Sequence, residues 1–337
     1  MGDGGGLVLI QLTKILADGD LDGLIAATVL KTVYPAAQVR FSHPAELRAG
    51  IHDDWIDKKT GLCDLPFHPR CGMYLDHHLT NRPSAEEQRV FEAEGGVCRW
   101  EDKPSAARVA YDLFCEDYDL SHLMPLMPMV DALDSGGITR QQFLSDDDII
   151  WLSRTISNRY PEYIQSVLKW LVDGRKLSEI MKEEIVQEKV NVKRAANEKM
   201  LELMPKVGKI VNRLAVVHLE NTGLSTNGYL VTAHYGAECD ACLIIHGYTD
   251  GAINTPQRPA LGASFYCNSF LHPAEGVMDL SQMATLLDPT GGGHANACGC
   301  RVQPLSPKGE IEDRDVCEND IELNLQKWLE VWNNNTQ

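Results

Sequence analysis

The chain begins with short apolar runs that end in acidic loops and alternate with stretches of helical period. Leu7–Leu16 is apolar apart from a break near Gln11, which predicts a strand that leads into the acidic loop at Asp18. Leu24–Val33 is apolar on a helical period and is followed by Pro35, which predicts a helix. The first fifty residues therefore predict a strand, an acidic loop and a helix.

The same alternation continues through the first half of the chain. Gln38–Phe41 predicts a second strand, and Gly72–Leu75 predicts a short buried strand that delivers Asp76. Helices are expected over Ser105–Tyr118 and Leu123–Leu133. Strands, ligand loops and helices in alternation predict an α/β domain with a parallel sheet and its chemistry at the carboxyl ends of the strands.

The second half of the chain predicts a separate, smaller α/β domain. From Pro161 to about Met204 the pattern is long, charged and helical, with no glycine after Gly174, as expected of a helical linker. The elements expected beyond it are strands at Leu214–His218, Ala241–Gly247 and Leu261–Cys267 and a helix at Met278–Leu287. We expect a catalytic domain at 1–165, a linker at 166–208 and a substrate-binding domain at 209–337. The acid-rich Lys308–Glu322 predicts a solvated face.

Composition narrows the classes of protein to consider. With 337 residues and 44% hydrophobic residues, the chain can form two cores, and no apolar run approaches the ~20 residues of a membrane span. Residues 1–6 lack the features of a secretory signal, so a cytoplasmic location is expected. The net charge of −17 disfavours a grip on long nucleic acid and favours a small phosphorylated substrate or a short oligonucleotide.

The ten cysteines raise the question of a zinc site. Cys239 and Cys242 form a CxxC, and Cys298 and Cys300 form a CxC. The interval between the pairs is far longer than a compact zinc ribbon uses, so buried free thiols are the favoured interpretation.

Asp18, Asp20 and Asp22 stand at alternate positions in a loop flanked by glycine. Three such carboxylates repel one another unless cations neutralise them. A solvated acidic turn and a calcium loop are alternatives, but the spacing and closing glutamate of an EF-hand are missing. A strand before the loop and a helix after it favour metal binding.

Two further motifs follow in order. Asp76-His77-His78 comes directly after an apolar strand, and Gly291-Gly292-Gly293-His294 lies far downstream. Taken with the acidic loop, this ordered set resembles the DHH family of metal-dependent phosphoesterases, in the branch with a DHH-associated C-terminal domain. The chain is similar to oligoribonucleases (nanoRNases) and to proteins related to exopolyphosphatases. The resemblance extends from about Lys14 to about Val302.

The resemblance implies roles for the residues of the triplet. His77 is expected to be a metal ligand and His78 to face the substrate phosphate. Asp76 either orients His77 or touches a metal, and the sequence does not separate these roles. These three residues are the expected catalytic set.

It also implies the remaining metal ligands. Asp18 stands where the family usually has histidine, and we expect it to be a ligand with Asp20 and Asp22. Asp64 best matches the family's second motif, while Asp53, Asp54 and Asp57 lie in a polar stretch expected to be exposed. For the fourth motif both Asp131 and Asp134 are candidates, with a slight preference for Asp131.

The downstream motif is expected to bind substrate. Glycines at 291–293 let the backbone approach a phosphate, and His294 can add a hydrogen bond or positive charge. A flexible surface loop is the alternative. Gly262–Asn268, the strand before this motif, lacks the arginine that many members carry there, which weakens the case for a nanoRNA substrate.

These residues predict a metal-dependent phosphoesterase that hydrolyses a small nucleotide or a short oligonucleotide. Two Mn²⁺ ions per active site are expected, and Mg²⁺ would also suit the carboxylates. The ions would share and activate a bridging water. The alternatives are an exopolyphosphatase-like hydrolase and a catalytically weak nucleotide sensor of the same fold. A homodimer is consistent with the resemblance.

Overall fold

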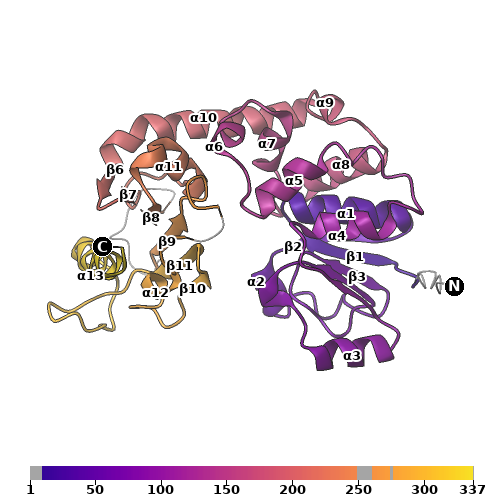
Figure 1. The fold of residues 1–337 in the computed structure, drawn as a ribbon, viewed down its shortest axis with the longest axis horizontal. Helices are drawn as coiled ribbons and strands as arrows, with labels where there is room; N and C mark the ends of the chain where they lie inside the picture. The colour runs from indigo at the N-terminus through magenta and orange to yellow at the C-terminus, as the bar shows by residue number, and fades with distance from the viewer. Residues whose placement is uncertain (1–9, 249–259, 274–275, 337) are drawn as a thin grey trace. The chain divides into compact units, whose positions relative to one another are not determined.

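The computed structural model describes residues 10–248, 260–273 and 276–336. The chain forms two compact units (Figure 1). The first contains Met1–Ile138 and Asp146–Lys193, and the second contains Thr139–Ser145 and Arg194–Gln337. The short segment Thr139–Ser145 therefore belongs to the second unit although its neighbours in sequence belong to the first.

The first unit is built on a five-stranded parallel sheet in the order β2-β1-β3-β4-β5, as the sequence predicted. The strands are β1 (Lys14–Asp18), β2 (Gln38–Ser42), β3 (Thr60–Cys63), β4 (Met73–Asp76) and β5 (Val97–Trp100). In a parallel sheet all carboxyl ends meet at one edge, so the residues that end these strands converge there.

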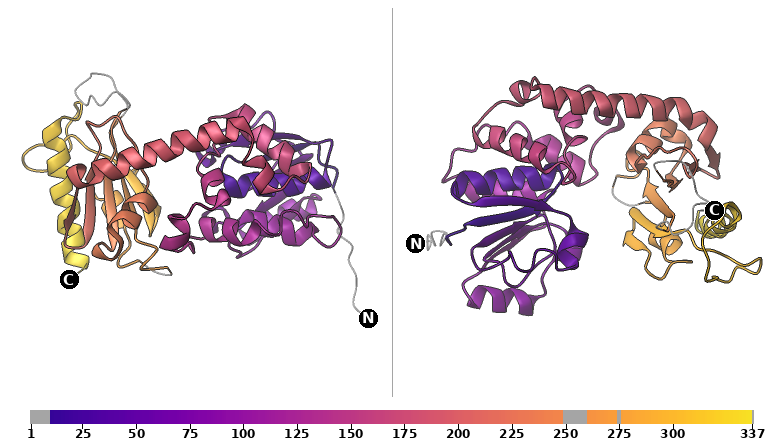
Figure 2. Two further views of the ribbon diagram at one scale, coloured as in Figure 1. Left: turned by 90° about the horizontal axis from the view of Figure 1, so that it is seen from above. Right: turned by 180° about the vertical axis from the view of Figure 1, so that it is seen from behind.

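Helices cover both faces of this sheet. Helices α1, α4 and α8 lie on one face and α3 on the other, as the two views in Figure 2 show. The helices of the first unit are α1 (Leu21–Val33), α2 (Pro44–Arg48), α3 (Ala85–Ala93), α4 (Ala106–Phe114), α5 (Met127–Asp134), α7 (Asp148–Ser153), α8 (Pro161–Val172) and α9 (Leu177–Ile180), with the 3₁₀ turn η1 (Leu79–Asn81).

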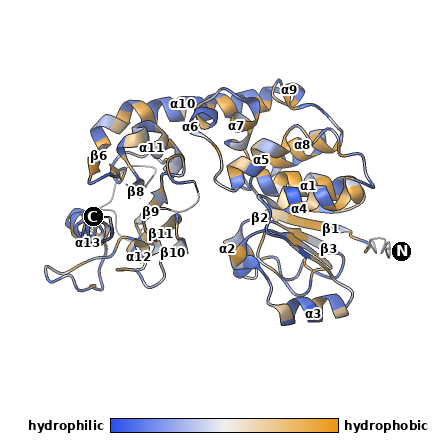
Figure 3. Ribbon diagram, viewed as in Figure 1, coloured by the Kyte–Doolittle hydropathy of each residue, from blue (hydrophilic) through white to orange (hydrophobic). Residues whose placement is uncertain are grey.

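Local chemistry explains where the helices nearest the sheet edge begin. Asp20 caps α1 by accepting the Gly23 N–H, and Ser105 caps α4 by accepting the Arg108 N–H. Eleven of the thirteen residues of α1 are buried, so this helix is apolar nearly all round. Strand β1 is likewise hydrophobic over most of its length (Figure 3). A buried strand and helix hold the Asp18–Asp22 loop between them.

The stretch predicted as one long helix is three helices. Helix α8 packs against α1 in the first unit, α9 follows Gly174, and α10 (Glu184–Val207) contains the point at which the two units divide. Gly174 has φ +75°, a left-handed conformation that ends α8. The predicted linker, residues 166–208, thus includes the second half of a helix that packs on α1.

The second unit contains a mixed six-stranded sheet in the order β10-β11-β9-β8-β7-β6, in which only β7 and β8 pair in parallel. Its strands are β6 (Gly208–Val211), β7 (Leu214–His218), β8 (Ala241–Ile245), β9 (Gly262–Cys267), β10 (Gly292–His294) and β11 (Ala297–Arg301). Its other elements are α6 (Arg140–Phe143), α11 (Gly228–Tyr235), η2 (Gly236–Glu238), α12 (Ser281–Ala284) and α13 (Glu318–Asn335).

Helix α13 completes the core of the second unit. Trp328 and Trp332 are fully buried, and the Trp328 ring meets Phe265 edge-on with centroids 5.3 Å apart. The acidic segment before this helix is only partly the solvated face that the sequence predicted. Asp320, in the first turn of α13, is fully buried and pairs with Arg314 of that segment. None of the described helices has the length and apolar character needed to cross a bilayer.

Candidate metal centre

Carboxylates gather at the carboxyl edge of the parallel sheet. Asp18 and Asp76 are the last residues of β1 and β4, and Asp64 directly follows β3. The described residues form three groups whose potential ligand atoms lie within 4.8 Å of one another. These groups are Asp18, Asp20 and Asp64; Asp22, His77 and Asp134; and Asp64, Asp76, His77 and His78.

The first loop positions its three aspartates in different ways. The Gly19 N–H donates to Asp18 Oδ1 at 2.6 Å, and the exposed Asp20 caps α1. Asp22 is buried, and its two oxygens accept the N–H groups of Ala106 and Ala107, each at 2.7 Å. Because these amides begin α4, the Asp22 carboxylate joins α1 to α4 and is held rigidly at the sheet edge.

Asp64 is buried and carries an unsatisfied oxygen. Its backbone has φ +57°, a left-handed conformation that aspartate tolerates better than most residues, and its N–H donates to the Leu75 carbonyl. Oδ1 has no hydrogen-bond partner among the described residues and lies 3.5 Å from His78 Nδ1. A buried, unpaired carboxylate oxygen is costly unless a cation occupies the space it faces.

Asp76 is fully buried, and both of its carboxylate oxygens accept hydrogen bonds. Its Oδ1 accepts the backbone N–H groups of His77 and His78 and lies 3.0 Å from His78 Nδ1, while Oδ2 accepts the Tyr74 hydroxyl and the Asn81 amide. Burial acts to raise the pKa of Asp76, but these bonds outweigh it and the pKa is lowered. The Asp76 side chain therefore orients the ring of His78, and its only bond to His77 is to the backbone.

The ring of His77 is oriented by a residue that sequence reasoning missed. His77 Nδ1 lies 3.0 Å from the carbonyl oxygen of Lys103. A carbonyl can only accept, so Nδ1 carries the hydrogen and Nε2 of the neutral ring carries a lone pair. Nε2 is buried without a hydrogen bond and faces Asp134 Oδ2 at 2.9 Å and Asp22 Oδ2 at 3.8 Å. These atoms fit a divalent cation that all three could contact.

The structure separates the two candidates for the fourth motif. Asp134 lies beside His77, whereas Asp131 pairs with Arg108 through Oδ2 at 2.6 Å and accepts the Ser105 hydroxyl at 2.7 Å. Asp131 belongs to none of the three groups. The preference for Asp131 is therefore not supported by the geometry, because an arginine already neutralises it. Both residues lie near the end of α5, and no sequence pattern indicates which one pairs with Arg108.

The electrostatics of the cluster also fit cations. Burial raises the pKa of Asp22 and Asp64, and the neighbouring carboxylates raise both further. Burial, followed by the charge of Asp20, raises the pKa of Asp18 to about 7. Within the part of the chain that the structure describes, no lysine or arginine pairs with Asp18, Asp22 or Asp64. Mn²⁺ or Mg²⁺ is the kind of ion that such oxygen-rich sites accept.

The other predicted positions lie apart from the sheet edge or in the second unit. Asp53 lies near His68, and Asp57 pairs with Lys14, so neither joins the cluster. In the second unit Gly292–His294 forms strand β10, paired antiparallel with β11, rather than the flexible surface loop that was the alternative. Gly293 has φ +138°, and a Cβ there would lie 2.7 Å from the Ala297 carbonyl oxygen, so the hairpin requires glycine. His294 is exposed.

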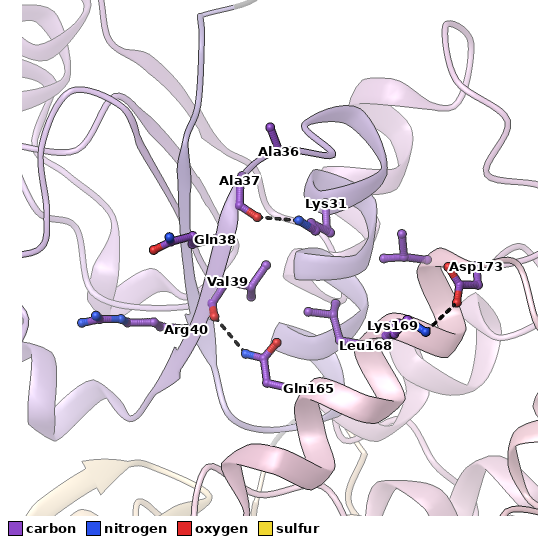
Figure 4. A pocket seen from close by; sticks show the side chains of 11 residues that line it. Lys31, Ala36, Ala37, Gln38, Val39, Arg40, Gln165, Leu168, Lys169 and Asp173 are labelled. Atoms are coloured by element: carbon purple, nitrogen blue, oxygen red, sulfur yellow. Dashed lines mark hydrogen bonds and ion pairs between the residues drawn. The ribbon is translucent and has the colours of Figure 1, made fainter.

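A pocket of about 580 Å³ lies by the amino end of the edge strand β2 and is not part of the cluster. It is lined by α1, α8 and residues 36–40, and Gln165 closes part of it by donating to the Val39 carbonyl at 2.8 Å (Figure 4). Lys31 donates there to the Ala37 carbonyl and Lys169 lies 3.7 Å from Asp173, so neither of these two cations is turned toward a ligand.

No protein-family model matches the chain, and no curated protein matches it. Among solved structures, the pGpG-specific phosphodiesterase PggH from Vibrio cholerae aligns with a TM-score of 0.71 at 19% identity, covering 96% of this chain and 99% of that one. The chain has the fold of that protein, in agreement with the two-domain α/β fold that the resemblance to the DHH family implied.

Two manganese-bound RecJ exonuclease structures align more weakly. One, from Thermus thermophilus, reaches a TM-score of 0.46 at 14% identity over 86% of this chain and 49% of that one. The other reaches 0.45 at 14% identity over 86% of this chain and 85% of that one. These scores are too low to support a statement about this chain.

Proposed function

We propose that the chain is a divalent-metal-dependent phosphodiesterase that hydrolyses a short linear nucleotide, with a 5′-phosphorylated dinucleotide as its substrate. The observation that carries the proposal is the set of electron-pair donors gathered around His77. The Lys103 carbonyl accepts from Nδ1, so Nε2 is the nitrogen turned toward the carboxylates of Asp22 and Asp134, and Asp64 Oδ1 nearby is buried without a hydrogen bond. Such a cluster needs cations to be stable, and the loops at this edge of the sheet are where α/β folds bind ligands.

Two groups of ligands divide the cluster. Asp18, Asp20 and Asp64 would hold one ion, and Asp22, His77 and Asp134 would hold a second. Bound there, the ions would supply an activated water and neutralise the charge that builds on the phosphoryl oxygens. Asp22 and His77 are fixed by the amides of α4 and by the Lys103 carbonyl, so the chain itself sets their geometry before any ligand arrives.

His78 would act on the substrate. Its hydrogen bond to Asp76 raises its pKa, so the ring holds a proton more readily at neutral pH and presents a positive edge to a phosphate. We include in the proposal a phosphate contact by residues Gly291–His294, where the space beside Gly292 is open. The net charge of −17 and the fold shared with a pGpG-specific phosphodiesterase support a short substrate over a long polymer.

The test is hydrolysis of pGpG by the purified chain with added Mn²⁺, read by product mass. We expect GMP as the product, no turnover with excess chelator, and no turnover by His77→Ala. Arg89→Gln, which alters an exposed residue of α3 that pairs only with the adjacent turn, is the matched control. Cleavage of polyphosphate but not of pGpG would replace the proposal with an exopolyphosphatase. Binding of Mn²⁺ and pGpG without turnover would replace it with a sensor.

A further inference from the structure

Two exposed arginines flank the short turn η1 that follows the Asp76-His77-His78 triplet. Arg82 ends the turn, and Arg48 reaches it from the end of α2. Each is connected to the triplet by contacts within the first unit, which place both arginines relative to the candidate metal centre.

Arg82 is connected through Trp100, the last residue of β5. The Arg82 guanidinium lies over the indole ring, 4.3 Å from its centroid, and the indole Nε1–H donates to the His78 carbonyl at 2.9 Å. The indole therefore fixes both the backbone of His78 and one face of the guanidinium. A planar cation held in this way loses little conformational freedom when it binds an anion.

Arg48 is connected through Asn81. Its Nη2 donates to Asn81 Oδ1 at 3.3 Å, and Asn81 Nδ2 donates to Asp76 Oδ2 at 2.9 Å. A second guanidinium thus contacts the turn, one amide away from the buried aspartate that orients His78.

The charge of Arg82 is not used within the chain. Several other arginines of the first unit pair with carboxylates, among them Arg108 with Asp131, Arg89 with Glu86 and Arg175 with Glu183. Among the described residues no side chain forms an ion pair or hydrogen bond with the Arg82 guanidinium. In a chain with 48 acidic and 31 basic residues, an unpaired cation next to a cluster of carboxylates favours an anionic ligand from outside.

We propose that Arg82, held on Trp100, binds the phosphate of the substrate that is not cleaved, with Arg48 as a second cation for the same group. This inference rests on the proposed function and adds to it the residue that makes the enzyme prefer a dinucleotide with a terminal phosphate. Guanidinium groups suit this role because they donate two parallel N–H bonds to phosphate oxygens.

The test compares pGpG with GpG, which differs only by the terminal phosphate, under steady-state kinetics with Mn²⁺. The wild type should show a higher kcat/KM for pGpG.

Arg82→Gln should reduce the ratio of the two kcat/KM values, pGpG over GpG, about tenfold. The loss should arise mainly from a higher KM for pGpG, since one charge-assisted contact is lost. Arg82→Lys should keep more of the ratio than Arg82→Gln. Arg89→Gln, which removes an exposed charge from the same unit, should leave the ratio unchanged.

The outcomes separate this inference from the proposed function. If the wild type hydrolyses neither substrate, the proposed function fails and the inference fails with it. If the wild type hydrolyses pGpG but Arg82→Gln leaves the ratio within about twofold, the phosphodiesterase stands and the role of Arg82 is refuted. A similar loss for both substrates also refutes it, because the effect would then not depend on the terminal phosphate.

Discussion

Both units bury carboxylates, but they neutralise them in opposite ways. In the second unit Asp288 and Asp320 are buried and each meets an arginine through two bonds, Arg301 at 2.8 and 3.0 Å and Arg314 at 2.6 and 2.8 Å. The Arg301 hydrogen bonds lower the pKa of Asp288. In the first unit Asp22 and Asp64 are as deeply buried, yet burial and neighbouring carboxylates raise their pKa.

The presence or absence of an arginine partner indicates the role of each buried carboxylate. An aspartate with its own arginine ties two segments of the chain together, as Asp288 ties Thr290 and Arg301 of the hairpin region. A cluster of aspartates without a cation of its own destabilises the fold until an ion from solution binds. The same contrast exists within the first unit, where Asp131 has Arg108 and Asp134, three residues later, has only His77.

His77→Ala is the substitution expected to have the largest effect. It removes the ring nitrogen that faces Asp22 and Asp134, so turnover of pGpG should fall on the order of a thousandfold or more. The protein should remain folded, because the side chain only lines the cluster. Activity assays and circular dichroism check the two halves of this prediction. Activity within tenfold of the wild type would remove His77 from the mechanism.

Metal binding should stabilise the first unit measurably. Saturating Mn²⁺ at about 100 times its dissociation constant should add about 2.7 kcal/mol to the free energy of unfolding, because the ion binds only the folded cluster. Thermal scans with Mn²⁺ and with chelator give the shift in Tm. The shift should be clearly smaller in Asp134→Asn, which removes a ligand of one of the two ions. A shift of equal size in that variant would show that the ion binds elsewhere.

Asparagine substitutions at the two kinds of buried carboxylate should change the free energy of unfolding in opposite directions. In metal-free protein Asp64→Asn should raise the stability by about 1 kcal/mol, because a neutral amide avoids the cost of burying a carboxyl among others and asparagine tolerates φ +57°. Asp288→Asn should lower it by about 2 kcal/mol, because it breaks the paired bonds to Arg301. Tm values in chelator test both, and a loss of stability in both variants would contradict the comparison.

Asp131→Asn should affect activity far less than Asp134→Asn. The Arg108–Asp131 pair is structural, so we expect a lower Tm and a less than tenfold loss of kcat/KM, whereas Asp134→Asn should abolish turnover. Paired kinetics of the two variants decide between the candidates. Equal losses of activity would place both residues in the mechanism.

The smallest expected effect is on the pH dependence of stability without metal. The Asp18 pKa is raised from 3.8 to about 7, so the folded protein holds a proton that the unfolded chain releases above pH 3.8. The contribution of Asp18 is therefore present in full below pH 3.8 and is lost as the pH rises towards about 7. In the wild type, Tm measured in chelator should fall as the pH rises through this range. The fall should be smaller in Asp18→Asn.

The sequence predicted the elements whose pattern is set locally. β7, at Leu214–His218, has the predicted bounds, and α1 begins three residues before the predicted start because Asp20 caps it. The parallel sheet followed from apolar strands that alternate with helices. Gly292–His294 was not predicted as a strand, because glycine has a low strand propensity and only pairing with β11 makes this segment a strand.

The sequence predicted a set of candidate ligands, but not the hydrogen bonds and ion pairs that orient them. The acidic loop and the resemblance to the DHH family pointed to Asp18, Asp20, Asp22, Asp64 and the triplet, which the fold brings to one edge. The Lys103 carbonyl that orients His77 leaves no signal in the sequence, since any residue has a carbonyl. The choice between Asp131 and Asp134 depends on where Arg108 reaches, a contact across two helices that no local pattern specifies.

Titration of metal-free protein with Mn²⁺ by calorimetry tests most directly the claim that the first unit needs cations from solution. We predict two ions bound per chain in the wild type, with at least one lost in both Asp64→Asn and His77→Ala and both retained in Asp288→Asn. Absence of Mn²⁺ binding by the wild type, or undiminished binding by the Asp64 and His77 variants, would contradict the account.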